Sequence, residues 1–225
     1  MSKAVVVFSG GLDSTVLLEQ CIKDHDEVYV LTFDYNQRHK KEIQVAKNYI
    51  ENIPSIMEHK VVDLSFFSNL VTSSAITNKD IDVPKMKDII GEAQSVAYVP
   101  NRNMMFLSIA ASYAESVGAS EIYYGAVAVD NLSGYWDCTE DFVVNINNLL
   151  SYNRMNRIEV KAPLLFKTKK EIVELGRELG VRFEHTWTCY EGKEISCGIC
   201  PSCAARLAGF KKAGIIDPLP YASNN

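Results

Sequence analysis

The sequence predicts an α/β protein with a doubly wound parallel sheet, and three observations support this fold class. Short apolar runs rich in β-branched residues alternate with helical patterns of ten or more residues. These runs are apolar at consecutive positions, which is typical of strands buried on both faces of a parallel sheet. A glycine pair, Gly10 and Gly11, directly follows the first run and leads into an apolar helical pattern.

Five strands are expected, and most are followed by a helix. The expected strands are residues 4–8, 27–33, 59–64, 121–124 and 158–161. One helix should follow the glycine pair, and the others should cover residues 40–51, 104–117, 141–150 and 168–180. Gly118 is suited to end the helix before it, and Thr168 with Glu171 has the spacing of a capping box. Residues 65–96 have no clear periodicity, so they predict either a lid over the active site or a disordered surface loop.

Composition describes an ordinary globular chain of 225 residues, with 47% hydrophobic residues and a formal net charge of −5. No apolar run approaches the roughly 20 residues needed to cross a bilayer, and the N-terminus resembles no signal peptide. We therefore expect a cytoplasmic protein that binds no membrane. The negative charge argues against a general nucleic-acid-binding surface. The length suits one large domain, residues 1–185, with a small C-terminal module, residues 186–225.

The turn after the first strand predicts an anion site. Glycines let the backbone approach phosphate oxygens, and the free N–H groups of the helix start favour negative charge. Ser9 and Ser14 add hydroxyl donors, while Asp13 can cap the helix or help to hold Mg²⁺. An ordinary tight turn between strand and helix is the alternative. The expected nucleotide-binding residues are Phe8, Ser9, Gly10, Gly11, Leu12, Asp13, Ser14, Thr15, Val16, Leu17 and Leu18.

Four cysteines near the C-terminus predict a metal site. Cys189, Cys197, Cys200 and Cys203 are separated by seven, two and two residues, a spacing that lets thiolates surround one tetrahedral ion. Zn²⁺ and an iron–sulfur cluster both fit this ligand set. Because all four ligands are protein groups, a zinc ion here would be structural, with no open position for chemistry.

Two loops and a helix start carry further candidate residues. Arg38 and His39 follow the second strand, at the sheet edge where ligands bind, although a solvated helix start explains them equally well. Arg102 precedes a helix, where a guanidinium can bind phosphate or carboxylate. The loop of residues 128–138 mixes aromatic and polar groups, which suits either binding of a flat heteroaromatic ring or a turn held by buried aromatics.

The segment SGGLDS resembles the pyrophosphate loop of the ATP pyrophosphatases, whose signature is SGGxDS. No lysine stands where a Walker A loop requires one. The resemblance implies a Rossmann-like fold of the adenine nucleotide alpha hydrolase type, with strand order 3-2-1-4-5. It also implies that ATP adenylates an oxyanion and releases pyrophosphate.

The pyrophosphate loop and the cysteine spacing together resemble the 7-cyano-7-deazaguanine synthase (QueC) family. Further shared motifs are FDYNQRH, VPNRN, KAPL, KTKKEIVELG and TWTCYEG. The resemblance implies that ATP and ammonia convert 7-carboxy-7-deazaguanine, through an adenylate and an amide, to the nitrile preQ0 of queuosine biosynthesis. It further implies a homodimer with bound ATP, Mg²⁺ and Zn²⁺. The implied catalytic residues are Ser9, Asp13, Ser14, Arg38 and Arg102, and the implied substrate-binding residues are Asp130, Ser133, Tyr135, Asp137, Lys161 and Lys167.

Three positions depart from the common family pattern. Trp136 and Thr139 replace the Pro and the Arg of SGYPDCR, and Asn101 stands where many members have Gly. The first two lie in the loop expected to contact the substrate. An alternative is therefore a paralogue that couples the activated carboxylate to another amine, for example on a protein. A non-catalytic nucleotide sensor is disfavoured, because Asp13 and both serines of the loop are intact.

Overall fold

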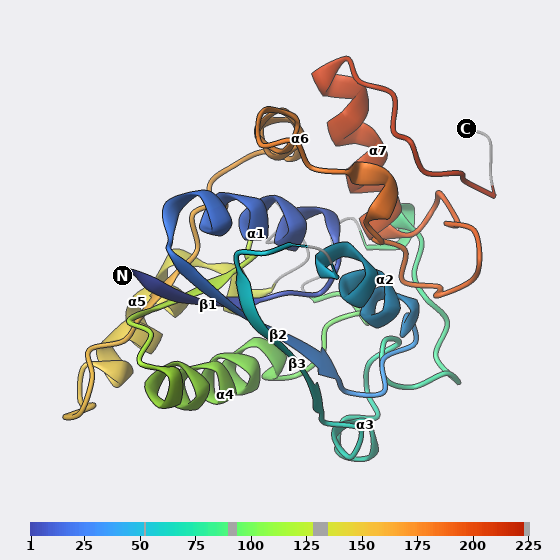
Figure 1. Ribbon diagram of the computed structural model, residues 1–225. Coiled ribbons are helices and arrows are strands. Elements are labelled where there is room, and N and C mark those ends of the chain that lie inside the picture. Colours follow the sequence, from blue (N-terminus) through green and yellow to red (C-terminus); the bar gives the residue numbers. More distant parts are fainter. Residues whose placement is uncertain (52, 90–93, 128–134, 223–225) are drawn as a thin grey trace.

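The computed structural model describes residues 1–51, 53–89, 94–127 and 135–222. Its centre is a five-stranded parallel sheet in the order β3-β2-β1-β4-β5, which confirms the predicted topology (Figure 1). The strands are β1 (Lys3–Val7), β2 (Glu27–Asp34), β3 (Ile56–Asp63), β4 (Glu121–Tyr124) and β5 (Glu159–Lys161).

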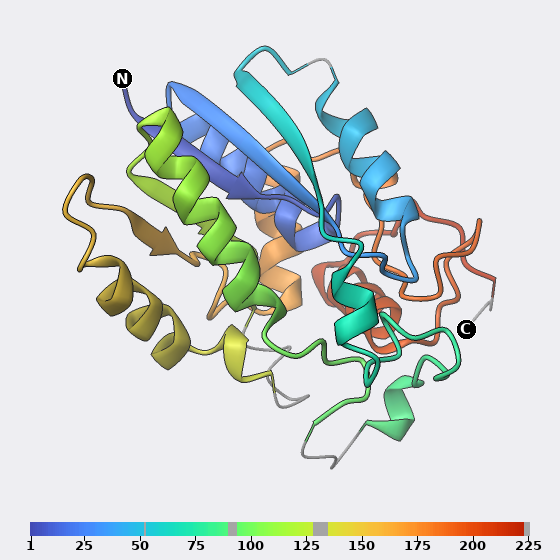
Figure 2. The ribbon, with the colours of Figure 1, turned by 90° about the horizontal axis from the view of Figure 1, so that it is seen from below.

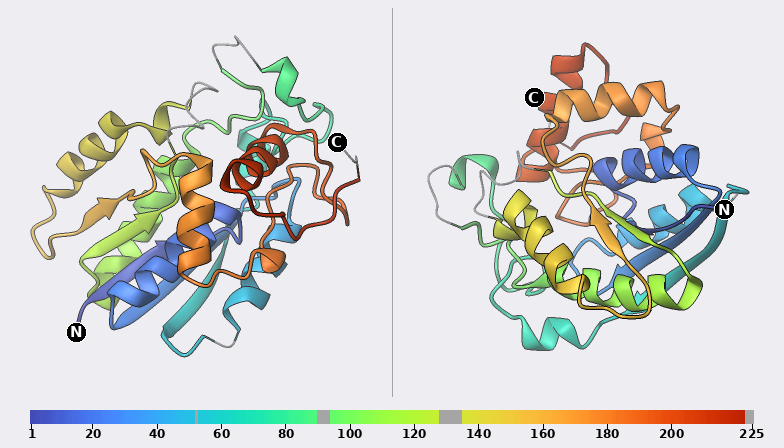
Figure 3. Two further views of the ribbon diagram at one scale, coloured as in Figure 1. Left: turned by 90° about the horizontal axis from the view of Figure 1, so that it is seen from above. Right: turned by 90° about the vertical axis from the view of Figure 1, so that its left-hand side faces the viewer.

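Helices cover both faces of the sheet, as a doubly wound fold requires. Figure 1 shows α1 and α2 above the sheet with α6 and α7, whereas α4 and α5 lie below it. Figure 2 shows the α4 and α5 face, and Figure 3 shows the opposite face from above. The helices are α1 (Leu12–Asp24), α2 (Lys41–Ile50), α4 (Arg102–Val117), α5 (Glu140–Leu150), α6 (Lys169–Glu178) and α7 (Pro201–Ala213).

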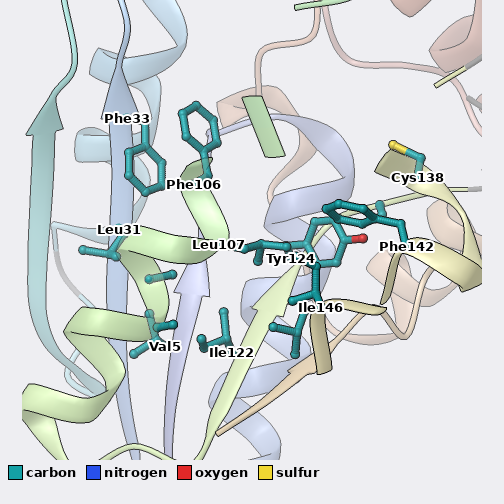
Figure 4. Close-up of a cluster of buried hydrophobic side chains, with 14 of the residues drawn as sticks. Val5, Leu31, Phe33, Phe106, Leu107, Ile122, Tyr124, Cys138, Phe142 and Ile146 are labelled. Atoms are coloured by element: carbon teal, nitrogen blue, oxygen red, sulfur yellow. The ribbon is translucent and has the colours of Figure 1, made fainter. Parts of the chain in front are cut away.

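Alternating side chains of the central strand build one core on each face. Val5 packs in the cluster toward α4 and α5, where Phe33 and Phe106 stack with ring centroids 4.0 Å apart (Figure 4). Val6 and Phe8 pack in the cluster toward α1 and α6. Both faces of β1 are therefore buried, which explains the run of consecutive apolar residues in the sequence.

The ends of several helices follow local sequence signals. Thr168 and Glu171 form the predicted capping box, and Gly118 ends α4 with a positive φ of 70°. The helix predicted at residues 104–117 begins two residues earlier, at Arg102, because Asn101 takes a left-handed conformation with φ of 57° directly before it. Asn and Gly tolerate this conformation best, which accounts for Asn101 at a position where family members have Gly.

The described parts of the connection from β3 to α4 contain short elements and backbone hydrogen bonds, such as that from Ala75 N–H to Val96 O at 2.9 Å. They include α3 (Phe67–Leu70) and the 3₁₀ turn η1 (Met86–Asp88), and Ala75 and Ile76 within the connection are buried. The 3₁₀ turns η3 (Trp136–Cys138) and η4 (Phe183–His185) complete the elements used below.

The C-terminal segment packs on the sheet domain through α7. Phe210 of α7 meets Phe183 in the core cluster of α1 and α6, with ring centroids 5.1 Å apart. The predicted boundary between residues 185 and 186 stays a prediction. Among the described residues, none of the helices is both long and apolar enough to span a membrane.

Candidate active site

A cavity of about 470 Å³ opens at the carboxyl ends of β1, β2 and β4. It lies where the strand order reverses between β1 and β4, the place at which open α/β sheets bind ligands. The turn after β1 forms its floor with Ser9, Gly11 and Asp13. Trp187 and Tyr190 of the cysteine-containing segment also line it, and the Trp187 backbone N–H donates to Gly10 O of the turn at 2.9 Å. The cavity thus joins the predicted phosphate turn to the predicted metal module.

The turn after β1 is held in one shape by its own hydroxyl groups. Ser14 Oγ donates to Gly11 O at 3.1 Å and accepts from the Ser9 backbone N–H at 3.3 Å. Gly10 has a φ of 78°, and a Cβ there would lie 2.8 Å from the carbonyl oxygen of Glu42 on α2. Only glycine fits this position. The N–H groups at the start of α1 therefore face the cavity in a fixed arrangement.

A lysine that sequence reasoning missed pairs with Asp13. Lys169 Nζ lies 2.9 and 2.8 Å from the two carboxylate oxygens of Asp13, and both side chains are largely buried. The aliphatic part of the Lys169 side chain packs against Gly209. A Cβ added to Gly209 would lie 2.7 Å from Lys169 Cγ. The proposed capping role of Asp13 is not seen, since no side chain caps α1. The pair instead places one anion and one cation beside the phosphate turn.

The cavity and a small adjoining cavity are lined by a half-buried arginine and a buried carboxyl group. Arg102 lies within a hydrogen-bond distance of 3.4 Å from the Tyr35 hydroxyl. Burial would lower the pKa of Arg102, but Tyr35 and Asp137 outweigh it and raise the pKa above its ordinary value. Burial raises the pKa of Asp137, and Arg102 only partly opposes this shift. Arg102 therefore stays cationic, while Asp137 keeps its proton to higher pH than an exposed aspartate does.

Three helix N-termini converge on the cavity. Its lining includes Asp13 and Ser14 of α1, Arg102 of α4, and Pro201 and Ser202 of α7. Each N-terminus contributes the positive end of a helix dipole. The net charge of the chain is negative, yet this cavity is suited to anions.

The four predicted metal ligands come together in the structure. The sulfur atoms of Cys189, Cys197, Cys200 and Cys203 all lie within 4.8 Å of one another. Backbone N–H groups of Cys197 and Cys200 point at the sulfurs of Cys189 and Cys197, both at 3.3 Å. Hydrogen bonding to Cys189 raises the pKa of Cys200, and a bound cation would offset this shift by stabilising the thiolates. The donor set fits a tetrahedral thiolate site.

Comparison with known proteins identifies the family of this chain. The family described as "Queuosine biosynthesis protein QueC" matches residues 3–214. The chain belongs to the QueC family. A 7-cyano-7-deazaguanine synthase of Clostridium kluyveri is 44% identical over 98% of both chains. A 7-cyano-7-deazaguanine synthase 1 of Colwellia psychrerythraea is 40% identical over 97% of this chain and 98% of that one. QueC membership connects this chain with queuosine biosynthesis and supports an enzymatic role.

Solved structures of lower identity were also compared with this QueC-family chain. A 4-thiouridine synthetase in complex with RNA and bound ATP is 22% identical, with a TM-score of 0.48, over 80% of this chain and 41% of that chain.

The structure separates the candidate residues that line the cavity of this QueC-family chain from those that do not. Arg102 and Tyr135 line it, and Asp137 lines a small adjoining cavity that shares both of them. Arg38 instead donates to the carbonyl oxygens of Ala75, Asn78 and Ile81, so its contacts give no support to a catalytic role. Asp130 and Ser133 lie outside the described residues.

Neither candidate lysine of the substrate site reaches the cavity. Lys161 Nζ forms an ion pair with Glu121 Oε1 at 2.6 Å, near His25 at the opposite end of β4. Lys167 precedes α6 and is also absent from the lining. Lys169 is likewise absent from the lining, but it pairs with Asp13, which lines the cavity.

The two departures from the QueC motif have structural roles in this chain. Thr139 Oγ1 caps α5 by accepting from the Phe142 N–H at 3.2 Å. The Trp136 indole N–H donates to the Tyr98 hydroxyl, and its ring packs edge-on against Phe142. Neither side chain lines the cavity. The contacts of Trp136 and Thr139 therefore do not call for a different acceptor.

Proposed function

We propose that this chain converts 7-carboxy-7-deazaguanine to 7-cyano-7-deazaguanine with ATP and ammonia, as a step of queuosine biosynthesis. The carboxylate is first adenylated, ammonia then gives the amide, and a second adenylation allows the amide to lose its oxygen as the nitrile forms. Family membership supports the overall conversion. The observation that carries the chemistry is the convergence of three helix N-termini and Arg102 on one cavity.

The turn after β1 would bind the phosphates of ATP. The N–H groups of Leu12, Asp13 and Ser14 lack intrahelical acceptors, so they can stabilise charge that develops on phosphate as pyrophosphate leaves. Asp13 would help to hold Mg²⁺, which supplies further charge neutralisation when bound. Lys169 is placed to bind phosphate oxygens at the same time, because its ammonium group already lies beside the turn.

The substrate would occupy the opposite half of the cavity. Arg102 is suited to bind the carboxylate and hold its oxygen toward the turn, since a guanidinium binds carboxylates in a bidentate manner. Tyr135 and Asp137 would contact the deazaguanine ring, and the raised pKa of Asp137 favours a protonated carboxyl that can donate a hydrogen bond. Asp130 and Ser133 belong to the same proposal, as does binding of the nucleotide by residues 8–18.

The remaining parts of the proposal concern the metal, the assembly and the location of the protein. The four cysteines would bind Zn²⁺ as a structural ion, because four protein ligands fill a tetrahedral shell. A homodimer in the cytoplasm, without nucleic-acid or membrane partners, completes the proposal.

The test is incubation with 7-carboxy-7-deazaguanine, ammonium, ATP and Mg²⁺, followed by mass spectrometry and pyrophosphate measurement. The expected products are the nitrile, AMP and pyrophosphate. Pyrophosphate release without any amide or nitrile would reject ammonia as the acceptor and favour an amine on another molecule. If no pyrophosphate is released with any nitrogen source, the proposal that this chain catalyses the reaction is rejected. The matched control is Asp13→Asn, which keeps the shape of the turn but removes the carboxylate charge.

A further inference from the structure

A buried histidine lies at the wall of the cavity, next to the phosphate turn. His39 follows β2, is 6% exposed, and lines the cavity together with Glu42. The turn is close by, because Gly10 packs against the backbone of Glu42. None of the steps proposed above uses His39. Its burial at a polar wall calls for an explanation, since a buried imidazole normally finds partners for both ring nitrogens.

The two nitrogens of His39 have very different surroundings. Nε2 lies 3.3 Å from Glu42 Oε1, the oxygen that also accepts from Gln37 Nε2 at 2.8 Å. A carboxylate oxygen that already accepts favours an N–H on Nε2, which leaves a lone pair on Nδ1. Nδ1 has no hydrogen-bond partner and is buried. His39 is therefore a lining residue of the cavity with one buried ring nitrogen that has no hydrogen-bond partner.

Glu42 is itself held in place, so the orientation of His39 is fixed. Gln37 is 1% exposed and also donates to the carbonyl oxygen of Phe33, which ties Glu42 to the end of β2. The other titratable group packed against His39 is Tyr190, whose ring centroid lies 5.6 Å away. A carboxylate that orients an imidazole is the usual arrangement of a histidine that accepts protons.

The proposed reaction releases protons from nitrogen at two stages. Ammonium must lose a proton before its nitrogen can attack the adenylated carboxylate, and the tetrahedral nitrogen then loses another. In the second stage, O-adenylation of the amide removes one N–H proton and gives a C=N–H group, and loss of AMP with the remaining N–H proton leaves the C≡N bond. A proton acceptor beside the phosphate turn would serve both stages.

We propose that His39, oriented by Glu42, accepts the N–H protons through Nδ1 during amide formation and nitrile formation. The inference rests on the proposed function above, because it assigns a residue to the nitrogen chemistry of that reaction. His39 has no part in the first adenylation, in which no proton leaves nitrogen. The two halves of the reaction should consequently respond differently to loss of the imidazole.

The test compares His39→Gln with the wild-type protein in two assays. The first is exchange of labelled pyrophosphate into ATP with 7-carboxy-7-deazaguanine present and ammonium absent, which reports adenylation alone. The second is formation of amide and nitrile at several ammonium concentrations. His39→Gln should leave exchange unchanged and lower the formation of both amide and nitrile by about 10²-fold. His59→Gln, which changes a histidine of β3 outside the cavity lining, is the matched control and should behave as wild type.

Each of the other outcomes rejects one part of the proposal. If the wild-type protein exchanges no pyrophosphate and makes no nitrile, the proposed function fails and this inference fails with it. If the wild type makes nitrile and His39→Gln equals it, His39 is not the acceptor. Equal loss of exchange and of nitrile in His39→Gln would assign His39 to the structure of the site instead. Glu42→Gln should lower the rate of nitrile formation while exchange is retained; an unchanged rate would reject the orienting role of Glu42.

Discussion

Lys169 Nζ contacts both carboxylate oxygens of Asp13, at 2.9 and 2.8 Å, across 156 positions of sequence. The contact joins the N-terminus of α6 to the phosphate turn. It keeps the Asp13 carboxylate paired within a largely buried site, where an unpaired charge would be costly. In the proposed reaction, the same ammonium group would neutralise phosphate while Asp13 helps to hold Mg²⁺.

Replacement of Lys169 should impair adenylation. Lys169→Ala removes the cation beside the turn, and we expect kcat/KM for ATP in pyrophosphate exchange to fall by about 10²-fold, as for other losses of transition-state charge stabilisation. Lys170→Ala is the control, because Lys170 is exposed and pairs only with Glu174 on the surface of α6. Equal activity of the two variants would contradict a phosphate-binding role for Lys169.

Replacement of Gly10 should damage both stability and nucleotide binding. In Gly10→Ala the new Cβ would meet the backbone of α2 at 2.8 Å, in addition to the strain of a φ of 78°. Gly118→Ala shares the positive φ of 70° but has nothing within 4 Å of the new Cβ, so it should lower the free energy of unfolding by only about 1 to 2 kcal/mol. Chemical denaturation compares the two variants. If Gly10→Ala lowers the free energy of unfolding less than Gly118→Ala does, α2 does not restrict the turn.

Removal of the metal should unfold the C-terminal segment. We expect one zinc ion per chain by elemental analysis, and Cys203→Ser should lose the metal and show a lower Tm, because the unpaired cysteines no longer hold the loop to α7. Cys21→Ala changes a buried thiol in the core of α1 and should keep the metal. Iron in place of zinc, with visible absorbance, would instead identify an iron–sulfur cluster.

Glu121 should contribute to stability at neutral pH but not in acid. Burial alone would raise the pKa of Glu121, but hydrogen bonds, that from Lys161 first, lower it to about 2. Because the folded pKa lies below the unfolded value of about 4.3, the contribution is complete above that pH and is lost as the pH falls toward 2. Glu121→Gln should therefore lower Tm at pH 7. Between pH 6 and pH 3, the Tm of this variant should fall less than that of the wild type. Glu178→Gln, a change at an exposed residue, is the control. Parallel curves of Tm against pH for the wild type and Glu121→Gln would refute a stabilising role of the ionised Glu121 carboxylate.

Local sequence patterns predicted the elements that depend on local physics. The consecutive apolar residues of 4–8 belong to a strand buried on both faces, and the glycine pair made the turn recognisable. Cysteine spacing alone indicated the ligand set, since close spacing brings the sulfurs together in any compact loop. The strand order came from the family resemblance rather than from periodicity.

The contacts of single polar side chains were harder to predict. Arg38 donates to backbone carbonyls of residues 75–81. Every residue has a backbone carbonyl, so residue types do not indicate which of them accept a hydrogen bond. Lys169 had a usable signal. It shares a helix face with the buried residues Ile172, Val173 and Gly176, whereas Lys167 lies before the helix begins. Helical spacing from a buried face would have chosen Lys169 among the neighbouring lysines.

The packing of Gly209 against Lys169 limits which C-terminal segments of relatives can replace that of this chain. A side chain at position 209 would displace the stem of Lys169 and, with it, the ammonium group beside Asp13. A chimera that takes its cysteine module from another homologue must therefore bring a glycine at this position, even if every metal ligand is present. Such a hybrid with a larger residue at 209 should bind metal normally and still adenylate poorly. Position 209 should therefore limit such hybrids even when all four cysteines are kept.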